Sequence, residues 1–188
     1  MAEPLRKRWT VADVEALPYD EWRRYEIIDG ELFVSIAARY EHQMTQKQIV
    51  VALDRWNGES QLGQVIPTPG VIFAISDAVI PDVVWISRER LAALLDDSGH
   101  LQGAPELMVE VLSPGRANER RDREIKLKQY SRYSVQEYWL LDWQGRTVDV
   151  YRQSPAGMIL AATLHSGDTL TSPVLPGFSA AVARLFAW

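Results

Sequence analysis

Hydrophobic positions along the chain fall into short blocks, and most blocks are bounded by Gly, Pro, Asn or Asp. Runs of β-branched and aromatic residues between such turn residues predict strands, whereas apolar positions three or four residues apart predict helices. By these criteria we expect strands at 71–75, 80–86, 106–112, 137–142, 147–152 and 158–163. We expect helices near 11–17, at 40–56 before Asn57-Gly58, at 88–97, at 118–133, and in a last turn that packs Leu185, Phe186 and Trp188.

Two features join these elements into one sheet. Residues 25–35 form two β-rich arms around Asp29-Gly30, a two-residue turn typical of hairpins. The strand–helix–strand order between 106 and 142 implies a right-handed crossover within one sheet. We therefore predict an α/β fold with a mixed β-sheet flanked by helices, an N-terminal hairpin and a C-terminal β-meander. The chain contains no repeat and no clear linker, so we expect a single domain over residues 1–188.

Composition narrows the function classes. The chain is 47% hydrophobic and 24% charged, as in globular proteins, and no apolar run approaches the roughly 18–20 residues of a membrane span. The N-terminus lacks the pattern of a secretory signal. The absence of cysteine excludes disulfides, thiol catalysis and cysteine zinc sites, and favours a cytoplasmic location. A net charge of -5 means that any site for a polyanion is local or neutralised by bound metal.

Two carboxylates break the apolar pattern of the strands. Glu110 lies inside LMVEVL, and a buried carboxylate is costly unless a partner compensates its desolvation. Asp82 follows Pro81 and directly precedes the apolar run VVWI. Two acids carried into one apolar sheet suggest a shared cation, because hard divalent metals take oxygen ligands. The alternative is that both side chains face water, Glu110 from an edge strand.

A lysine on the helix after Ser113-Pro114 is the third unusual feature. Measured from Asp122 at about 100° per residue, Lys126 falls at about 40° and Tyr130 at about 80°, whereas Lys128 falls at about 240°. Lys126 is thus predicted on the buried face and Lys128 in solvent. A buried lysine needs an anionic partner, and Glu110 is a candidate because its strand leads into this helix. The alternative partner is Asp122, four residues earlier.

Two further residues are weaker candidates. Glu26 lies on the first arm of the hairpin and could point to either face of it. His42 shares a helical face with Ile49 and Leu53, near the start of its helix, and could line a site there. The alternatives are a solvent-facing strand residue for Glu26 and a hydrogen-bonded boundary histidine for His42.

Several segments, taken in order, form a recognisable set. They are YEIIDGEL, the helix entered at His42, IPDVVWIS, PELMVEVLSP, RRDREIKLKQY, SVQEYWLLD and HSGDTLTSPVLPGF. This ordered set spans nearly the whole chain and resembles the Uma-two family of restriction endonucleases, which is assigned to the PD-(D/E)xK nuclease superfamily. The resemblance implies a restriction-endonuclease-like fold.

The resemblance also implies roles for particular residues. Asp82 matches the first acid of the superfamily motif and Glu110 the second. The superfamily places a lysine two residues after the second acid, where this chain has Leu112. The resemblance implies that in this family the lysine lies instead on the following helix, where this chain has Lys126. Glu26 matches the acidic residue of the family's N-terminal hairpin.

The activity implied by the resemblance is Mg²⁺-dependent hydrolysis of DNA. Asp82 and Glu110 would hold Mg²⁺ or Mn²⁺, with the Val111 carbonyl as a third ligand, and Lys126 would orient water or stabilise the transition state. A homodimer is plausible, because a double-strand cutter of this size usually needs two sites. Leu112 favours an alternative, a nuclease-fold module with weak or no activity that binds nucleic acid or a protein partner. A metal-dependent hydrolase of a small substrate is a third interpretation.

Overall fold

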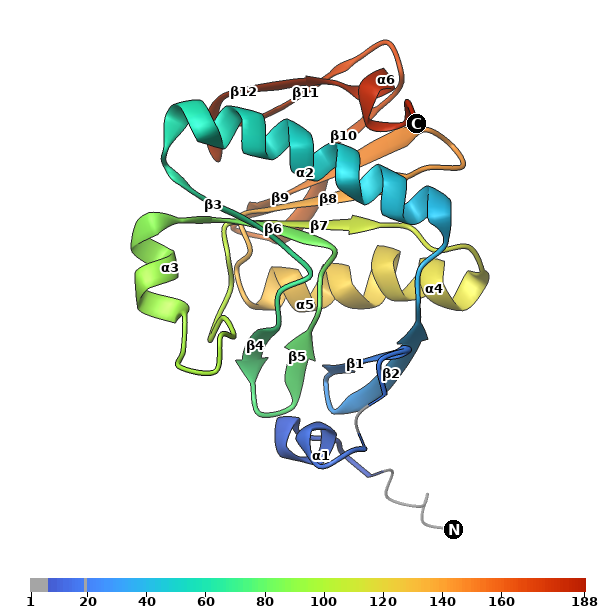
Figure 1. Cartoon of the computed structure of the whole chain (residues 1–188), viewed down its shortest axis with the longest axis vertical. Coiled ribbons are helices and arrows are strands. Elements are labelled where there is room, and N and C mark those ends of the chain that lie inside the picture. The colour runs from blue at the N-terminus through green and yellow to red at the C-terminus, as the bar shows by residue number, and fades with distance from the viewer. Residues whose placement is uncertain (1–6, 19) are drawn as a thin grey trace.

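A six-stranded sheet runs through the centre of the molecule in the computed structural model, which describes residues 7–18 and 20–188 (Figure 1). The strand order is β10-β9-β8-β7-β6-β3, in which β7 and β8 run parallel and the other neighbours run antiparallel. The mixed sheet predicted from the sequence is therefore confirmed. The strands are β3 (Gly63–Pro67), β6 (Val83–Ser87), β7 (Leu107–Val111), β8 (Glu137–Asp142), β9 (Thr147–Ser154) and β10 (Gly157–Leu164).

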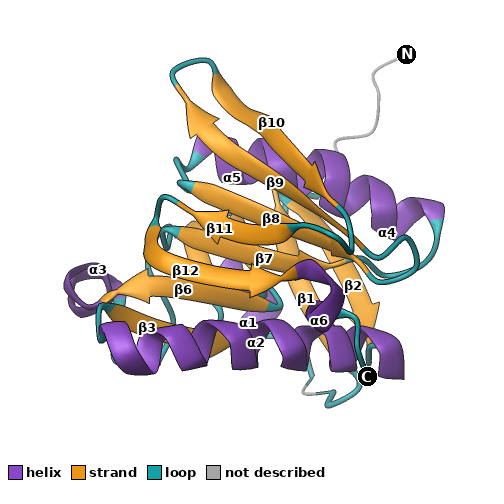
Figure 2. Cartoon of the chain, turned by 90° about the horizontal axis from the view of Figure 1, so that it is seen from above, coloured by secondary structure: helices purple, strands orange, loops and turns teal. Residues whose placement is uncertain are grey.

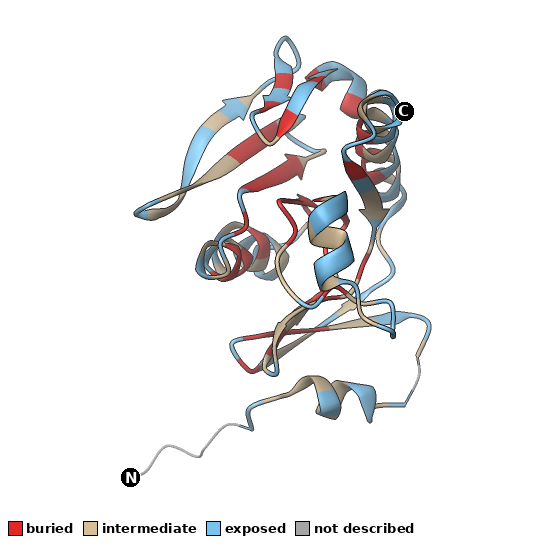
Figure 3. Ribbon diagram, turned by 90° about the vertical axis from the view of Figure 1, so that its left-hand side faces the viewer, coloured by how far each residue is buried: buried red, intermediate tan, exposed pale blue. Residues whose placement is uncertain are grey.

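Helices cover both faces of this sheet. On one face lie α2 (Tyr40–Ser60), the two-stranded sheet of β11 (Thr169–Ser172) and β12 (Leu175–Ala181), and α6 (Val182–Leu185) (Figure 2). On the other face lies one continuous helix made of α4 (Arg116–Arg120), a π-helical turn η1 (Arg121–Lys126) and α5 (Leu127–Arg132) (Figure 1). Buried residues are concentrated in the central strands and on the helix faces turned toward them (Figure 3).

The alternation of side chains along β7 divides the core into two halves. Leu107, Val109 and Val111 belong to the apolar cluster beneath α2. Met108 and Leu112 belong to the cluster on the opposite face, which includes Tyr130 of α5. Because successive strand residues point to opposite faces, Glu110 is directed toward the layer of η1 and α5.

A second sheet carries the N-terminal hairpin. Its strand order is β2-β1-β5-β4, formed by β1 (Arg23–Ile28), β2 (Glu31–Ile36), β4 (Val71–Ala74) and β5 (Asp77–Val79). The turn between β1 and β2 has positive φ at both central residues, 51° at Asp29 and 76° at Gly30, as a two-residue hairpin requires. The short helix α1 (Val11–Glu15) lies against this sheet, and α3 (Arg88–Leu94) follows β6 (Figure 1).

The expected end of α2 at Asn57-Gly58 is wrong. The helix continues to Ser60 and ends at Gln61, which has φ 56°. Asn57 does not act as a stop signal because its side chain bonds elsewhere: Oδ1 accepts hydrogen bonds from the Gly63 backbone and from the Trp85 indole. A glycine within a helix costs only about 1 kcal/mol, which this packing outweighs.

The strand expected over 80–86 is present, but it begins three residues later than predicted. Residues 77–79 form β5 in the second sheet, and β6 of the central sheet begins only at Val83. Pro81 lies between these two strands and has no backbone N–H to donate, so the chain does not continue as one strand from β5 into β6. Asp82 consequently lies at a bend, at the start of β6.

Other boundaries differ less. The helix expected at 88–97 ends at Leu94, and β3, β11 and β12 were not predicted because their runs are short and partly polar. Leu185 and Phe186 are buried as expected, whereas Trp188 is 40% exposed. None of the helices in the described part of the chain combines the length and apolar character needed to cross a membrane.

Candidate active site

Five residues singled out in the sequence line one pocket. They are Glu26, His42, Asp82, Glu110 and Lys126, and the pocket they line encloses about 40 Å³. Each comes from a different element: β1, the first turn of α2, the bend before β6, β7 and η1. The carboxyl end of β7 and the starts of α2 and α4 lie on the same side of the molecule (Figure 1). Residues up to 100 positions apart in the sequence (126 − 26) are thus brought together.

Lys126 is bound by two carboxylates. Its Nζ lies 2.7 Å from Oε1 of Glu110 and 2.9 Å from Oε1 of Glu26, and its side chain is 2% exposed. The Tyr130 hydroxyl donates a second hydrogen bond, of 2.8 Å, to the same oxygen of Glu110. Glu110 therefore does not face water, and the strand that carries it is central rather than an edge strand. The alternative partner, Asp122, is instead bound by Arg121 at 2.9 Å.

The π-helical turn helps to place Lys126. Four residues of an α-helix rotate by about 40° more than a full turn, so side chains four residues apart gradually turn away from a buried face. A π turn is wider and advances less per residue, which offsets that drift. Asp122, Lys126 and Tyr130 are all buried as a result, while Lys128 is exposed as predicted.

Asp82 is held from three directions. Its Oδ2 accepts a hydrogen bond of 2.8 Å from the Val111 backbone and lies 3.1 Å from Nε2 of His42. Its own backbone carbonyl accepts a 2.7 Å hydrogen bond from Nε2 of Gln46. Because His42 and Gln46 are one helical turn apart on α2, that helix fixes both ends of Asp82.

Glu26 points into the pocket rather than to solvent. Besides Lys126, its Oε1 accepts a 2.9 Å hydrogen bond from the Ile80 backbone, in the segment between β5 and β6. This hydrogen bond therefore joins the hairpin β1–β2 to the segment that leads to Asp82. The face occupied by Glu26, left open by the sequence, is the buried one.

The electrostatics of the pocket reflect an excess of acids. Burial raises the pKa of Glu110 to about 8; the charge of Lys126 opposes the rise, and the nearby carboxylates of Asp82, Asp122 and Glu26 add to it. Burial also acts to raise the pKa of Asp82, but the hydrogen bonds from His42 and Val111 outweigh it and the pKa is lowered. The pKa values of the two central acids are thus shifted in opposite directions, that of Glu110 upward and that of Asp82 downward. A cation bound nearby would lower the pKa of Glu110 and favour its ionised form.

The donor atoms of the pocket fit a hard divalent cation. Oδ1 of Asp82 and Oε2 of Glu110 accept no hydrogen bond from any residue that the structure describes, although the other oxygen of each is fully used. Within the described ranges, no three His, Asp or Glu side chains gather in the arrangement of an all-protein metal cage. Mg²⁺ does not require one, because it usually binds one or two carboxylates and keeps several waters.

Several residues of the site were not found from the sequence. Arg24 lines the pocket with its Nη1 3.8 Å from Oδ1 of Asp82, and Arg121 lines it beside Lys126. Nothing in the local pattern of β1 distinguishes Arg24 from its neighbours, and Arg121 is one of several arginines in the charged stretch 116–132. Gln46 could have been found, because it lies four residues after His42 on the same helical face.

A comparison with solved structures supports the fold. A putative nuclease belonging to DUF820 from Anabaena variabilis is similar with a TM-score of 0.75 and 17% identity, over 94% of this chain and 97% of that one. The type IIG restriction endonuclease BpuSI is matched with a TM-score of 0.45 and 15% identity, over 77% of this chain and 15% of that one. No curated protein matches the chain.

The comparison with family models covers most of the chain. The model Uma2, described as "Putative restriction endonuclease", matches residues 11–183. This range contains every residue of the pocket described above. The chain therefore belongs to the Uma2 family.

Proposed function

We propose that this protein is a metal-dependent endonuclease that hydrolyses phosphodiester bonds of DNA. The observation that carries the proposal is the convergence of Asp82, Glu110 and Lys126 in one buried pocket. Two buried acids, one on a strand and one at the bend before a strand, and a lysine in contact with one of them are a costly arrangement in a protein interior, and such arrangements are candidates for functional sites. Membership of a restriction endonuclease family supports the choice of DNA as substrate.

Asp82 and Glu110 would hold Mg²⁺ or Mn²⁺ through their unoccupied oxygens, with the Val111 carbonyl as a third ligand. A bound divalent cation supplies Lewis-acid activation of water and neutralises charge on the phosphate. The protein holds the two carboxylates ready: Val111 and His42 fix Asp82, and Lys126 and Tyr130 fix Glu110. Each acid thereby has one oxygen held by hydrogen bonds, whereas the other accepts none; Oδ1 of Asp82 lies 3.8 Å from Nη1 of Arg24.

Lys126 would orient the attacking water and stabilise the charge that develops on the phosphate. Although burial opposes its charged form, the carboxylates of Glu110, Glu26 and Asp122 raise its pKa, so the ammonium stays protonated at neutral pH. Leu112, at the usual lysine position, lies in the apolar cluster on the same face of the sheet as Glu110. Lys126 thus reaches Glu110 from the helix, whereas a lysine at position 112 would reach it from the same strand.

Glu26 would contribute a further, water-mediated ligand. Arg24 and Arg121 would contact phosphate oxygens, because both line the pocket and carry fixed positive charge. All of these residues come from a single protomer, so the proposed chemistry does not depend on the homodimer predicted from the sequence, which stays a prediction.

The alternative function is a nuclease-fold module without turnover that binds nucleic acid or a protein partner. Leu112 favours it, as does the engagement of Lys126 with two carboxylates, which leaves that lysine one remaining donor. The two functions differ in whether DNA is cut.

Cleavage of supercoiled plasmid distinguishes them. The wild type is incubated with Mg²⁺, with Mn²⁺ or with EDTA, alongside Glu110→Gln and the matched control Glu119→Gln, whose side chain is exposed on α4. We expect metal-dependent nicking by the wild type and the control and loss of at least about 10²-fold in Glu110→Gln. Cutting in EDTA, or equal cutting by Glu110→Gln, would contradict the proposed site. No cutting by the wild type with either metal favours the module.

A further inference from the structure

The strand β2 forms an open edge of the second sheet. It lies at the end of the order β2-β1-β5-β4, and β1 is the only strand that pairs with it in the part of the chain that the structure describes (Figure 1). Its sequence, ELFVSI, carries one charge, at Glu31, and its register with β1 contains no bulge. Edge strands are normally protected by charges, proline or a bulge, because their free backbone groups pair readily with another chain. Residues 32–36 have none of these features.

The other edges of the two larger sheets are protected. The strand β10 has a bulge between Leu160 and Ala162, and β3 ends in Pro67. The strand β4 is covered by Leu101, whose backbone carbonyl accepts a 2.8 Å hydrogen bond from the Ile72 N–H. Among these four described edges, β2 is therefore the one that lacks protection.

The register of β2 shows which of its backbone groups face outward. Ile28 and Glu31 flank the two-residue turn, so they form a hydrogen-bonded pair, and such pairs alternate along an antiparallel ladder. Glu31 and every second residue after it therefore bond to β1. Leu32, Val34 and Ile36 instead direct their N–H and C=O groups away from the sheet, where another strand can reach them.

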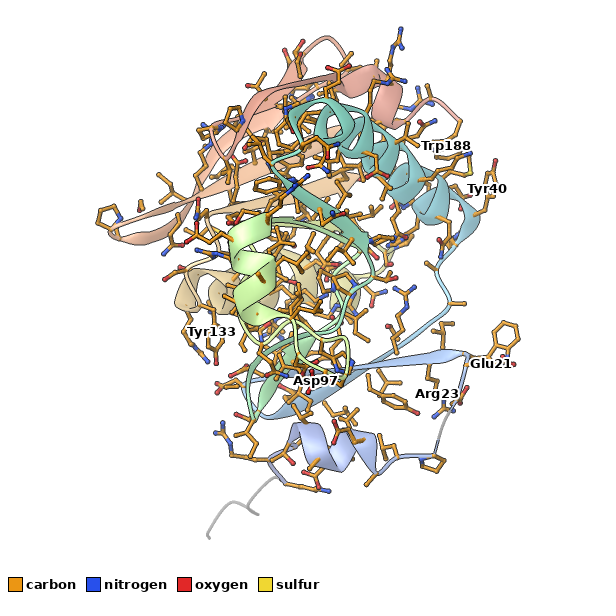
Figure 4. The ribbon with its side chains drawn as sticks, turned by 60° about the vertical axis from the view of Figure 1, so that its left-hand side comes forward. Glu21, Arg23, Tyr40, Asp97, Tyr133 and Trp188 are labelled. Carbon is orange, nitrogen blue, oxygen red and sulfur yellow. The ribbon has the colours of Figure 1, made fainter. Side chains whose placement is uncertain are left out.

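The side chains of these same three residues form an apolar face. Val34 is 49% exposed, and Ile36 is 76% exposed, the largest fraction for any large hydrophobic side chain among the described residues. Leu32 and Val34 also line a groove with Trp22, which is 67% exposed. The groove includes the start of β1, which lies at the outer surface where Figure 4 labels Arg23. An apolar surface of this kind beside a free strand edge indicates an interaction site.

We propose that β2 pairs with β2 of a second copy of this chain, antiparallel and about a two-fold axis at Val34. In this register Val34 lies opposite Val34 of the second copy and Leu32 lies opposite Ile36 of the second copy, so all three outward residues of each copy are paired. Their side chains meet on one face, because opposite residues of an antiparallel pair share a face. Glu31 lies opposite Ala37, so like charges do not meet. An edge that matches itself in this way fits the isologous interface of a two-fold dimer.

The same pairing places the two candidate active sites on one side of the dimer. Glu26 pairs with Phe33 and Arg24 pairs with Ser35, so these pocket residues point to the face opposite that of Val34. Antiparallel pairing joins the two sheets with equivalent faces on the same side. Both pockets therefore lie on one side of the joined sheet. The pairing itself does not rest on the proposed function.

The mass of the protein in solution tests the pairing. Light scattering coupled to size exclusion, without DNA or metal, should give the wild type twice the mass of one chain. Val34→Lys and Val34→Glu should each be monomeric, because two like charges would lie opposite each other on the axis. An equimolar mixture of these two variants should recover the dimer, because opposite charges then meet. The matched control Leu160→Lys, 53% exposed on the edge strand β10, should stay dimeric.

Cross-linking tests the register without relying on loss of the dimer. The chain contains no cysteine, so a single introduced thiol can form only an intermolecular disulfide. Opposite residues of a hydrogen-bonded antiparallel pair have Cα atoms about 5.5 Å apart, a separation that a disulfide spans. Mild oxidation should therefore convert Val34→Cys to a covalent dimer much faster than the control Leu160→Cys.

The outcomes separate this proposal from the proposed function. A monomeric wild type, a dimer retained by Val34→Lys, or cross-linking of Val34→Cys no faster than that of Leu160→Cys would overturn the pairing. If Val34→Lys is monomeric but melts at a lower temperature than the wild type, recovery of the dimer with Val34→Glu and the cross-linking rate decide. A dimer through β2 that cleaves no DNA would overturn the nuclease and leave the pairing standing, and a monomer that cleaves DNA would do the opposite.

Discussion

The ammonium of Lys126 lies 2.7 Å from a carboxylate oxygen of Glu110, although the two residues belong to different layers of the fold. The strand β7 directs Glu110 toward the helix that follows it, and the π turn of that helix directs Lys126 back toward the strand. The contact therefore depends on two local patterns, the alternation of a strand and the phase of a helix, that meet across one layer.

Replacement of Asp82 by asparagine should weaken metal binding without unfolding the protein. Asparagine keeps one oxygen that can accept the Val111 N–H, but it carries no charge for a divalent cation. We expect calorimetry with Mn²⁺ to show at least about a tenfold loss of affinity for Asp82→Asn, because an ionised ligand oxygen is lost. The control Asp54→Asn, exposed on α2, should bind as the wild type does. Identical titrations for Asp82→Asn and the wild type would remove Asp82 from the metal site.

The stability of the metal-free protein should fall as the pH rises from about 5 to 8. Burial, opposed by Lys126 and reinforced by the neighbouring acids, raises the pKa of Glu110 to about 8, above the 4.5 of an unperturbed glutamate. Between these values the glutamate is ionised in the unfolded state but still protonated in the folded state, so the free energy of unfolding decreases as the pH rises. Urea denaturation in EDTA across this range measures the slope, which Glu110→Gln should flatten. A slope unchanged in that variant would show that other groups titrate.

A lysine placed on the strand should partly replace Lys126. Leu112 lies two residues after Glu110, on the same face of the sheet, so a lysine there can reach the same carboxylate. In a Lys126→Ala background we expect Leu112→Lys to recover about tenfold of the lost plasmid cleavage, with less stability than the wild type because an apolar contact is lost. Leu112→Arg, which has a charge of the same sign but a planar head group, should recover less. No recovery by either variant would mean that the position on the helix is itself essential.

The position of a side chain could be predicted from the sequence where it depends on a single helix or strand. The strand pattern around Glu110 and the helical phase of Lys126 were both predictable, because each follows from a local period. Gln46 and Arg24 were not, because their roles depend on which segment lies opposite them. The break at Pro81 was visible in the sequence, but its effect depends on pairing with two different sheets. Asn57 failed as a stop signal because tertiary partners, Gly63 and Trp85, occupy its side chain.

Plasmid cleavage by two lysine variants tests the central claim most directly. Lys126 is buried against Glu110 and Glu26, whereas Lys128, two residues later on the same helix, is exposed. With Mg²⁺ or Mn²⁺, Lys126→Ala should cleave at least about 10²-fold more slowly than the wild type, the loss typical of one preorganised charged group. Lys128→Ala should cleave at nearly the wild-type rate, and Lys126→Ala should still bind Mn²⁺, because lysine is not a ligand. Equal cleavage by both variants and the wild type would contradict the account.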